Sequence, residues 1–336
     1  MKTPFDVVIV GAGPAGLAAA IAASRRGLSS VVVEKGALVN SLLHYPTDMV
    51  FFTTPELLEI GGYPFVSPHE KPTRQEALRY YRRITDAGGI NLALGETVSA
   101  ITRHESGTFT VVSEGDGAQR QRSAAAVIMA TGAYDVPNML GVPGEDLPHV
   151  SHYYREPHAH YRRRVVVVGG KNSAAEAALD LFRAGSRVLL VHRGAALGES
   201  IKYWVKPDIE NRIAEGSIAA RFLTRVTAIT PTEVQLLGPE GVVHEPAEAV
   251  LLLTGYRADT TLLRSAGAQI DEQAGAPVHD PDTFETTVPG LYVIGACVAG
   301  RQSGRIFIEN GRLHGEVAVR TIASRLGATT PSPSGA

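Results

Sequence analysis

The sequence predicts an α/β fold made of two nucleotide-binding units, the second repeating the first. Three observations lead to this fold class. A strand, FDVVIV, runs directly into the turn GAGPAG and then into a helix. The same order of strand, glycine turn and helix returns at RVVVVGGKNSA in the middle of the chain. Two further apolar runs end in Thr-Gly, at Thr131-Gly132 and at Thr254-Gly255. Strands that alternate with helices are typical of parallel sheets.

The first glycine turn has the G-x-G-x-x-G spacing, with Gly11, Gly13 and Gly16 at the three glycine positions and Pro14 and Ala15 between the last two. The first glycine permits a tight turn, the second permits close approach of a pyrophosphate, and the third permits helix–strand packing. The N-terminus of the following helix offers free N–H groups to phosphates. This stretch therefore predicts a dinucleotide site.

Glu34 ends the second predicted strand, Val31 to Val33, at the position where an acid accepts hydrogen bonds from ribose hydroxyls. A carboxylate there would repel a 2′-phosphate. From the residues alone, the first site is expected to take FAD or NAD(H).

The second copy repeats the first at constant offsets: Gly169, Ala174, Ala178, Gly185 and His192 are spaced as are Gly11, Gly16, Ala20, Gly27 and Glu34. It ends on His192-Arg193 instead of an acid, and this pair suits a 2′-phosphate, so NADPH is expected. Lys171 replaces the middle glycine and weakens the motif. The predicted NADPH contacts are Gly169, Gly170, Lys171, Asn172, Ser173, Ala174, His192, Arg193 and Lys202.

The remaining pattern predicts the domain organisation. A covering loop follows Lys35-Gly36, and its Tyr45, Phe51 and Phe52 either pack on a ligand ring or fill core. Thr73 and Glu76 form a capping-box pattern that predicts a helix to about Asp86. A Pro- and Gly-rich linker follows Pro137. We expect a second domain to begin near Pro137, a helical stretch from about Arg305 to Leu326, and a disordered tail at 328–336.

Composition excludes several classes of protein. The chain has 336 residues, is 44% hydrophobic and 20% charged, and carries a net charge of −2, so a globular protein without affinity for nucleic acid or anionic membrane is expected. No apolar run approaches a membrane span, and no signal peptide fits before the first strand, so we expect a cytoplasmic protein. The single cysteine, Cys297, excludes an internal dithiol pair.

Over nearly its whole length the chain resembles flavoproteins of the low-molecular-weight thioredoxin reductase type, which have two Rossmann-like domains. The resemblance rests on GAGPAG, Glu34, the Ala130-Thr131-Gly132 segment, the second glycine motif and PGLYVIGA. It implies that FAD binds one discontinuous domain, 1–137 and 248–327, and that NADPH binds an inserted domain at 138–247. Two features depart from this group: the chain lacks the C-x-x-C before the second motif, and it has Gly295-Ala296 where the group has Gly-Asp.

Within that architecture, the stretches EKG, HYPT, GGKNSA, SIK and IFIENG-x-x-HG are similar to the bacillithiol disulfide reductase family. Members often carry a cysteine inside the first glycine motif, and here that position is Ala15. The resemblance implies an NADPH-dependent FAD oxidoreductase that reduces bacillithiol disulfide to thiols, as a homodimer or dimer of dimers. It also implies further FAD contacts at Lys35, Val98, Ala130, Thr131, Gly132, Gly295, Ala296, Ile306 and Phe307.

Without a dithiol, the disulfide is expected to be reduced at the flavin itself. Cys297 is a weak catalytic candidate beside the predicted flavin edge, and a small buried cysteine is the alternative reading. Lys171, Lys202, Arg301 and Arg305 are candidate cationic contacts for the carboxylates of bacillithiol.

Three other functions remain open. Ferredoxin–NADP reductases of this architecture also lack the C-x-x-C. A flavin monooxygenase is less favoured, because F-x-G-x-x-x-H-x-x-x-W is absent. A non-catalytic flavin-binding module is least favoured, since two sites of different nucleotide preference imply electron exchange. His152, His158 and His160 cluster without cysteine or acid partners at metal-ligand spacing, so no metal is expected.

Overall fold

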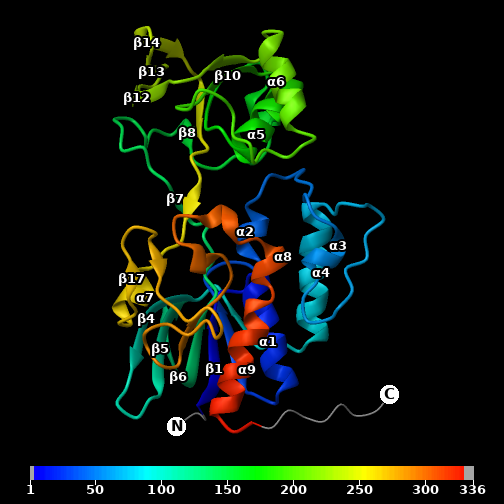
Figure 1. Cartoon of the computed structure of the whole chain (residues 1–336), viewed down its shortest axis with the longest axis vertical. Coiled ribbons are helices and arrows are strands. Elements are labelled where there is room, and N and C mark those ends of the chain that lie inside the picture. The colour runs from blue at the N-terminus through cyan, green and yellow to red at the C-terminus, as the bar shows by residue number, and fades with distance from the viewer. Residues whose placement is uncertain (1–3, 329–336) are drawn as a thin grey trace. The chain divides into compact units, whose positions relative to one another are not determined.

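The computed structural model describes residues 4–328, so the predicted tail lies almost wholly outside the described residues (Figure 1). The chain forms two compact units. The first contains the described residues up to His44, then Met49–Val136, and resumes at Tyr256. The second contains Tyr45–Asp48 and Pro137–Gly255. The predicted insertion of one nucleotide-binding domain into another is therefore the observed architecture.

The first unit is built on a seven-stranded sheet of order β3-β2-β1-β6-β5-β4, with β19 also paired to β6. Strand β6 is long enough to use one edge twice: residues Ala118 to Ala124 pair with β5, and Val127 to Met129 pair with β19. Strands β1, β2, β3, β6 and β19 run parallel to one another, whereas β5 runs antiparallel to both of its neighbours, β4 and β6. The carboxyl ends of the parallel strands therefore meet at one edge, where ligands of such sheets bind.

The strands of this unit are β1 Phe5–Val10, β2 Ser30–Glu34, β3 Leu92–Leu94, β4 Thr97–Arg103, β5 Phe109–Gly115, β6 Ala118–Met129, β16 Tyr256–Arg257, β17 Ile270–Asp271, β18 Ala276–Pro277 and β19 Leu291–Val293; β7, Val136–Pro137, lies at its boundary. Its helices are α1 Pro14–Arg25, α2 Asn40–Leu43, α3 Pro55–Leu58, α4 Arg74–Ala87, α7 Thr261–Ser265, α8 Ile308–Gly311 and α9 His314–Arg325, and 3₁₀ turns cover Gly295–Ala299 and Ser303–Arg305.

Two helices of this unit confirm or refine the sequence predictions. Helix α4 begins after Thr73 with the predicted capping box, in which Glu76 bonds back to the Thr73 N–H at 2.8 Å. The helical stretch expected from Arg305 to Leu326 is interrupted, because α8 ends at Gly311 and α9 begins at His314. Helix α9 then lies beside α1 (Figure 1), where a Cβ added at Gly315 would be 2.7 Å from the Ala19 nitrogen. Glycine is therefore required for this close helix contact.

The second unit contains a parallel five-stranded sheet of order β11-β10-β9-β15-β8 and an antiparallel three-stranded sheet of order β12-β13-β14. Its strands are β8 Val150–Ser151, β9 Arg164–Val168, β10 Arg187–Val191, β11 Ala219–Arg221, β12 Arg225–Ile229, β13 Glu233–Gly238, β14 Gly241–Pro246 and β15 Ala249–Leu252. Its helices are α5 Asn172–Arg183 and α6 Lys206–Ala214, with a 3₁₀ turn at His158–His160.

The return from the second unit to the first differs from the expected boundary at 247/248. Strand β15 pairs with β9 along Ala249 to Leu252 and with β8 through Val250 and Leu251. Its apolar side chains lie in the core of the second unit, so the boundary falls at Gly255/Tyr256. An apolar strand does not reveal from its sequence which of two sheets it joins.

Candidate functional site

The first glycine turn connects β1 to α1 and has room for a ligand at one glycine only. A Cβ at Gly16 would lie 2.0 Å from the Gly11 oxygen, and a Cβ at Gly11 would lie 2.5 Å from the Ala130 oxygen. A Cβ at Gly13 would meet no described atom within 4 Å. No side chain caps α1, which starts with Pro14 after Gly13. The open side of the turn and the uncapped helix start fit the pyrophosphate of a dinucleotide.

Glu34 lies at the end of β2 and is only 7% exposed. Its Oε2 accepts a hydrogen bond from the Ala12 N–H at 2.8 Å, and its Oε1 accepts from the Gly36 N–H at 2.9 Å. A carboxylate accepts about four hydrogen bonds in total, so capacity for ribose hydroxyls remains. The adjacent Lys35 is ion-paired with Asp135 at 2.8 Å.

The ends of β6 and β19 complete this site. The Thr131 hydroxyl, just after β6, is buried and has no hydrogen-bond partner among the described residues. Gly132 and Gly295 both have φ near +70°, at 73° and 69°, and a Cβ at Gly295 would lie 2.8 Å from the Ala15 Cβ. An orphaned hydroxyl beside two glycine turns fits a polar ligand, as FAD requires.

The other predicted flavin contacts are dispersed. Val98 and Phe51 are buried core residues, whereas Phe52 and Phe307 are 40% and 46% exposed and meet edge to face with ring centroids 5.3 Å apart. Tyr45 belongs to the second unit. Ala296 and Ile306 are partly buried in the turns that follow β19.

Cys297 is completely buried, with its thiol bonded to backbone oxygens. Sγ donates to the Ile294 oxygen at 3.0 Å and lies 3.3 Å from the Met129 oxygen. Burial raises the pKa of this thiol to about 11. The thiol is therefore protonated near neutral pH and lacks the exposed, electropositive surroundings of a reactive cysteine.

The second glycine turn lies between β9 and α5 and repeats the first closely, since α5 covers the same offsets as α1. A Cβ at Gly169 would lie 2.6 Å from the Leu253 oxygen and 2.8 Å from the Ala174 Cβ. Lys171 and Ser173 are exposed at the helix start. The Asn172 amide bonds the Ser200 oxygen and the Lys202 N–H at 2.9 Å each, which holds the segment 200–202 to the helix start.

His192 lies against the second glycine turn. A Cβ at Gly170 would be 2.2–2.4 Å from atoms of the imidazole ring, so only glycine fits beneath it. Burial, and secondarily the charge of Arg193, lower the pKa of His192. Arg193 is exposed and forms no ion pair with any residue from 4 to 328, whereas the Lys202 ammonium is ion-paired with Glu176. Among the described residues, the unpaired positive charge beside the end of β10 is therefore that of Arg193.

Two searches of the described residues bear on other functions. Between residues 4 and 328, no group of three or more His, Cys, Asp or Glu side chains is arranged to hold a metal ion. His152 of the predicted histidine cluster lies 3.4 Å from the Glu145 carboxylate, measured from Nε2 to Oε1. No helix of the described chain is long and apolar enough to cross a membrane.

The sequence did not assign roles to two features of the first site. The Gly295 N–H donates to Nδ1 of His314 at 3.2 Å, and Phe284 stacks on the His314 ring with centroids 4.2 Å apart. His314 stands in the segment IFIENG-x-x-HG, but nothing in the sequence indicated its partner, because the two residues that contact it lie on other segments.

Comparisons with known proteins agree with this geometry. Residues 8–295 match the model of a family described as pyridine nucleotide-disulphide oxidoreductase. Bacilliredoxin reductase Bdr of Bacillus subtilis (strain 168) is 40% identical over 95% of this chain and 97% of that protein. The solved bacillithiol disulfide reductase Bdr (YpdA) of Bacillus cereus is 38% identical with a TM-score of 0.94, covering 96% of this chain and 100% of that one.

More distant relatives share the fold. Ferredoxin–NADP reductase 1 of Bacillus licheniformis is 26% identical over 88% of this chain and 82% of that protein. Solved thioredoxin reductases also have this fold, as the sequence predicted.

Proposed function

The chain belongs to the pyridine nucleotide-disulphide oxidoreductase family, and we propose that it reduces bacillithiol disulfide, a low-molecular-weight disulfide, to two thiols. It is an oxidoreductase whose cofactors are FAD and NADPH. In the proposed reaction, NADPH, one proton and the disulfide yield NADP⁺ and two thiols. When bound, FAD accepts the hydride of NADPH and supplies the electron pair to the disulfide.

The state of Cys297 is the observation that carries the proposal. It is the one cysteine of the sequence, its side chain is 0% exposed, and its pKa is raised to about 11. A relay of electrons through protein thiols needs a reactive pair. A substrate that is small enough to reach the cofactor directly does not need this relay.

Two nucleotide sites of different chemistry support the cofactor assignment. In the first, Glu34, Gly13 and Thr131 would hold FAD by its ribose, pyrophosphate and a further polar group. In the second, Arg193 would pair with the 2′-phosphate of NADPH, with His192 covering the turn beneath it. Arginine forms bidentate hydrogen bonds with phosphate and keeps its charge at every physiological pH.

The substrate assignment is supported by one of the four candidate cations more than by the others. Arg305 is exposed and forms no ion pair with the described residues. Arg301 donates to the Gln273 oxygen at 3.1 Å, and Lys202 is paired with Glu176. Arg305 is therefore the proposed contact for a substrate carboxylate on the first unit, and Lys171 is the exposed member of the four candidates on the second.

The names of the relatives suggest two protein acceptors as competing substrates, a bacilliredoxin and a ferredoxin. The direct test is a stopped-flow experiment with enzyme that has been reduced anaerobically by NADPH. It is mixed in turn with bacillithiol disulfide, glutathione disulfide, an oxidised bacilliredoxin and a ferredoxin. We expect flavin reoxidation to be fastest with bacillithiol disulfide, and Arg305→Gln to raise the KM for it several-fold.

Arg264→Gln is the matched control, since Arg264 is an exposed arginine of the same unit that is ion-paired with Glu272 at 2.7 Å. It should leave the KM unchanged. Reoxidation by ferredoxin at many times the rate with bacillithiol disulfide would make the protein an electron transferase. Fastest reoxidation by the bacilliredoxin would make the acceptor a protein and contradict the small-substrate proposal.

A further inference from the structure

The turn after β19 is held by a histidine that lies 19 residues farther along the chain. His314 is the first residue of α9, and its Nδ1 accepts the hydrogen bond of the Gly295 N–H at 3.2 Å. Gly295 starts the 3₁₀ turn Gly295–Ala299 and is itself buried. It lies so close to the first glycine turn that a Cβ on it would be 2.8 Å from the Ala15 Cβ. The conformation at Gly295 therefore shapes the wall of the first nucleotide site.

The ring of His314 is fixed by aromatic stacking. Phe284 stacks with two imidazoles: its centroid is 4.2 Å from that of His314 at an interplanar angle of 19°, and 5.9 Å from that of His279 at 16°. Nδ1 of His279 donates to the Pro277 oxygen at 2.8 Å. Phe284 has φ of 62°, a left-handed conformation that a phenylalanine adopts only under constraint. Phe284 therefore combines a strained backbone with a ring that stacks on His314.

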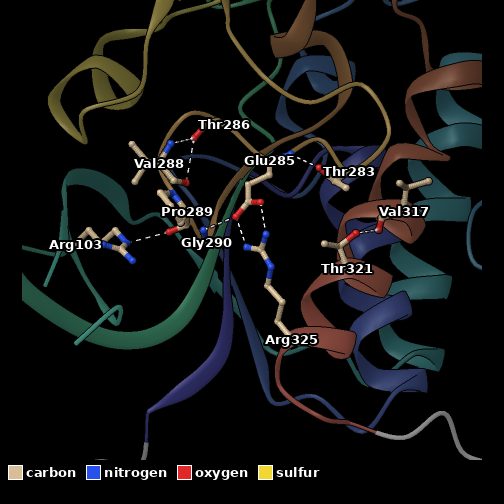
Figure 2. A network of polar contacts seen from close by, with 10 residues as sticks. All are labelled: Arg103, Thr283, Glu285, Thr286, Val288, Pro289, Gly290, Val317, Thr321 and Arg325. Carbon is tan, nitrogen blue, oxygen red and sulfur yellow. Dashed lines mark hydrogen bonds and ion pairs between the residues drawn. The ribbon is translucent and has the colours of Figure 1, made fainter. Parts of the chain in front are cut away.

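The segment that carries Phe284 is also attached to the other end of α9 (Figure 2). Arg325, in the last turn, forms a bidentate ion pair with Glu285. Oε1 of Glu285 also accepts from the Gly290 N–H at 2.7 Å. Helix α9 is therefore joined to one segment twice, at its first residue through Phe284 and at its last through Glu285. This double attachment restricts both the position and the rotation of the helix that presents His314.

The hydrogen bond requires an unprotonated Nδ1. Burial, and secondarily the charge of His279, lower the pKa of His314 to about 4. The ring is therefore neutral near pH 7, with its proton on Nε2, and Nδ1 is free to accept.

We propose that His314 is a positioning residue for the flavin: its Nδ1 holds the Gly295 N–H and so fixes the turn after β19 against the glycine turn at Ala15. This inference rests on the proposed function for the identity of the cofactor. The neighbouring Ala296 brings no polar side chain to the site, so the shape of the turn depends on how its backbone is held. Stacking on Phe284 fixes the orientation of the His314 ring, and the hydrogen bond to Nδ1 of His314 fixes the backbone of the turn at Gly295.

A pair of substitutions separates the acceptor from the ring. His314→Phe keeps an aromatic ring for Phe284 to stack on but removes the acceptor. His314→Asn removes the ring but keeps an oxygen near the place of Nδ1. The readouts are the dissociation constant of FAD, measured by fluorescence on apoprotein, and the visible spectrum of the bound flavin. Both are independent of turnover, and far-UV circular dichroism checks the fold of each variant.

We expect His314→Phe to raise the FAD dissociation constant about five- to tenfold, as the loss of one hydrogen bond implies, and to shift the flavin spectrum. His314→Asn should stay within about twofold of wild type. His279→Phe, which preserves an aromatic ring stacked on Phe284, is the control and should bind FAD as wild type does. If His314→Phe folds poorly, His314→Ala replaces it with the same expectation.

Wild-type affinity in His314→Phe, or an equal loss in His314→Asn and His314→Phe, would overturn the positioning role. The proposed function is tested by a different comparison. If the wild-type protein itself binds no FAD, or is not reduced by NADPH, that function fails; if it does both while His314→Phe is unaltered, only the role of His314 is lost.

Discussion

At the scale of single residues, Glu34 combines two tasks. It accepts backbone N–H groups of Ala12 and Gly36 at 2.8 and 2.9 Å, and it lies where ribose hydroxyls of a dinucleotide would approach. The same carboxylate therefore shapes the turn and would bind the ligand.

We expect Glu34→Ala to raise the FAD dissociation constant about ten- to a hundredfold, or about 1.5–3 kcal/mol, as removal of charge-assisted hydrogen bonds does. Fluorescence titration of apoprotein measures it. Asp6→Ala is the control: Asp6 also accepts a backbone N–H, that of Ser29 at 2.7 Å, but at the opposite end of the same strands. An equal loss in both variants would mean that the effect is one of folding. Release of FMN rather than FAD on denaturation would refute the cofactor assignment.

Cys297 gives a second prediction for one residue. Serine replaces its thiol by a hydroxyl that can donate to the same oxygens of Ile294 and Met129, so Cys297→Ser should fold and keep kcat within about twofold of wild type. Steady-state assays with bacillithiol disulfide measure this. Loss of disulfide reduction while NADPH still reduces the flavin would make Cys297 a catalytic thiol.

At the scale of elements, the two βαβ units differ where their second strands end. Strand β2 ends on Glu34, and β10 is followed by His192 and the exposed Arg193. Arg193→Ala should raise the KM for NADPH at least about tenfold, because it removes a charge-assisted contact worth about 1.5–3 kcal/mol, and should change the KM for NADH little. Equal use of NADH and NADPH by wild type would refute the assignment of the 2′-phosphate.

The stability of helix α9 depends on the ion pair in its last turn as well as on the packing of the helix. The Glu285 side chain is 14% exposed and also holds Gly290, whereas Arg325 is half-exposed. Arg325→Met should lower the free energy of unfolding by about 1–2 kcal/mol, measured by urea denaturation. Arg264→Met, at an ion pair whose side chains are 47% and 75% exposed, should cost less than about 0.5 kcal/mol. Similar losses of unfolding free energy in the two variants would show that the Arg325–Glu285 ion pair contributes no more than an ordinary surface ion pair.

At the scale of the whole molecule, three histidines, His160, His192 and His314, have lowered pKa values, in each case chiefly through burial. In the unfolded chain these histidines take up protons below about pH 6.5, whereas in the folded protein each takes up its proton only at a lower pH. The contribution of these histidines to the free energy of unfolding is therefore complete above pH 6.5 and decreases as the pH falls. For His314 the decrease continues to about pH 4.

We expect the urea midpoint of the wild-type protein to fall between pH 6.5 and pH 4, with His314 contributing at most about 3 kcal/mol. His314→Asn should show a shallower decline over the same range. A midpoint that does not change across this window, or an identical slope in the variant, would contradict the protonation state assigned to His314.

The glycine turns, the strand ends and the capping box of α4 follow from local spacing, so they were predictable from sequence. The position of β15, the burial of Phe51 and the contact of His314 with Gly295 were not. Each depends on contacts between separate segments of the chain, and an apolar run or a single histidine carries no signal for its partner. The repeat at Gly169 could be recognised because two copies in one chain can be compared with each other.

The enclosed position of Cys297 has a consequence for survival under oxidants. Peroxide attacks thiolates that solvent can reach and drives them to sulfinic and sulfonic acids, which for most enzymes is irreversible. A catalyst whose single sulfhydryl is protonated and fully covered offers no such target. Its disulfide reductase activity would therefore not be lost through oxidation of its own thiol, as happens in enzymes that depend on reactive cysteines.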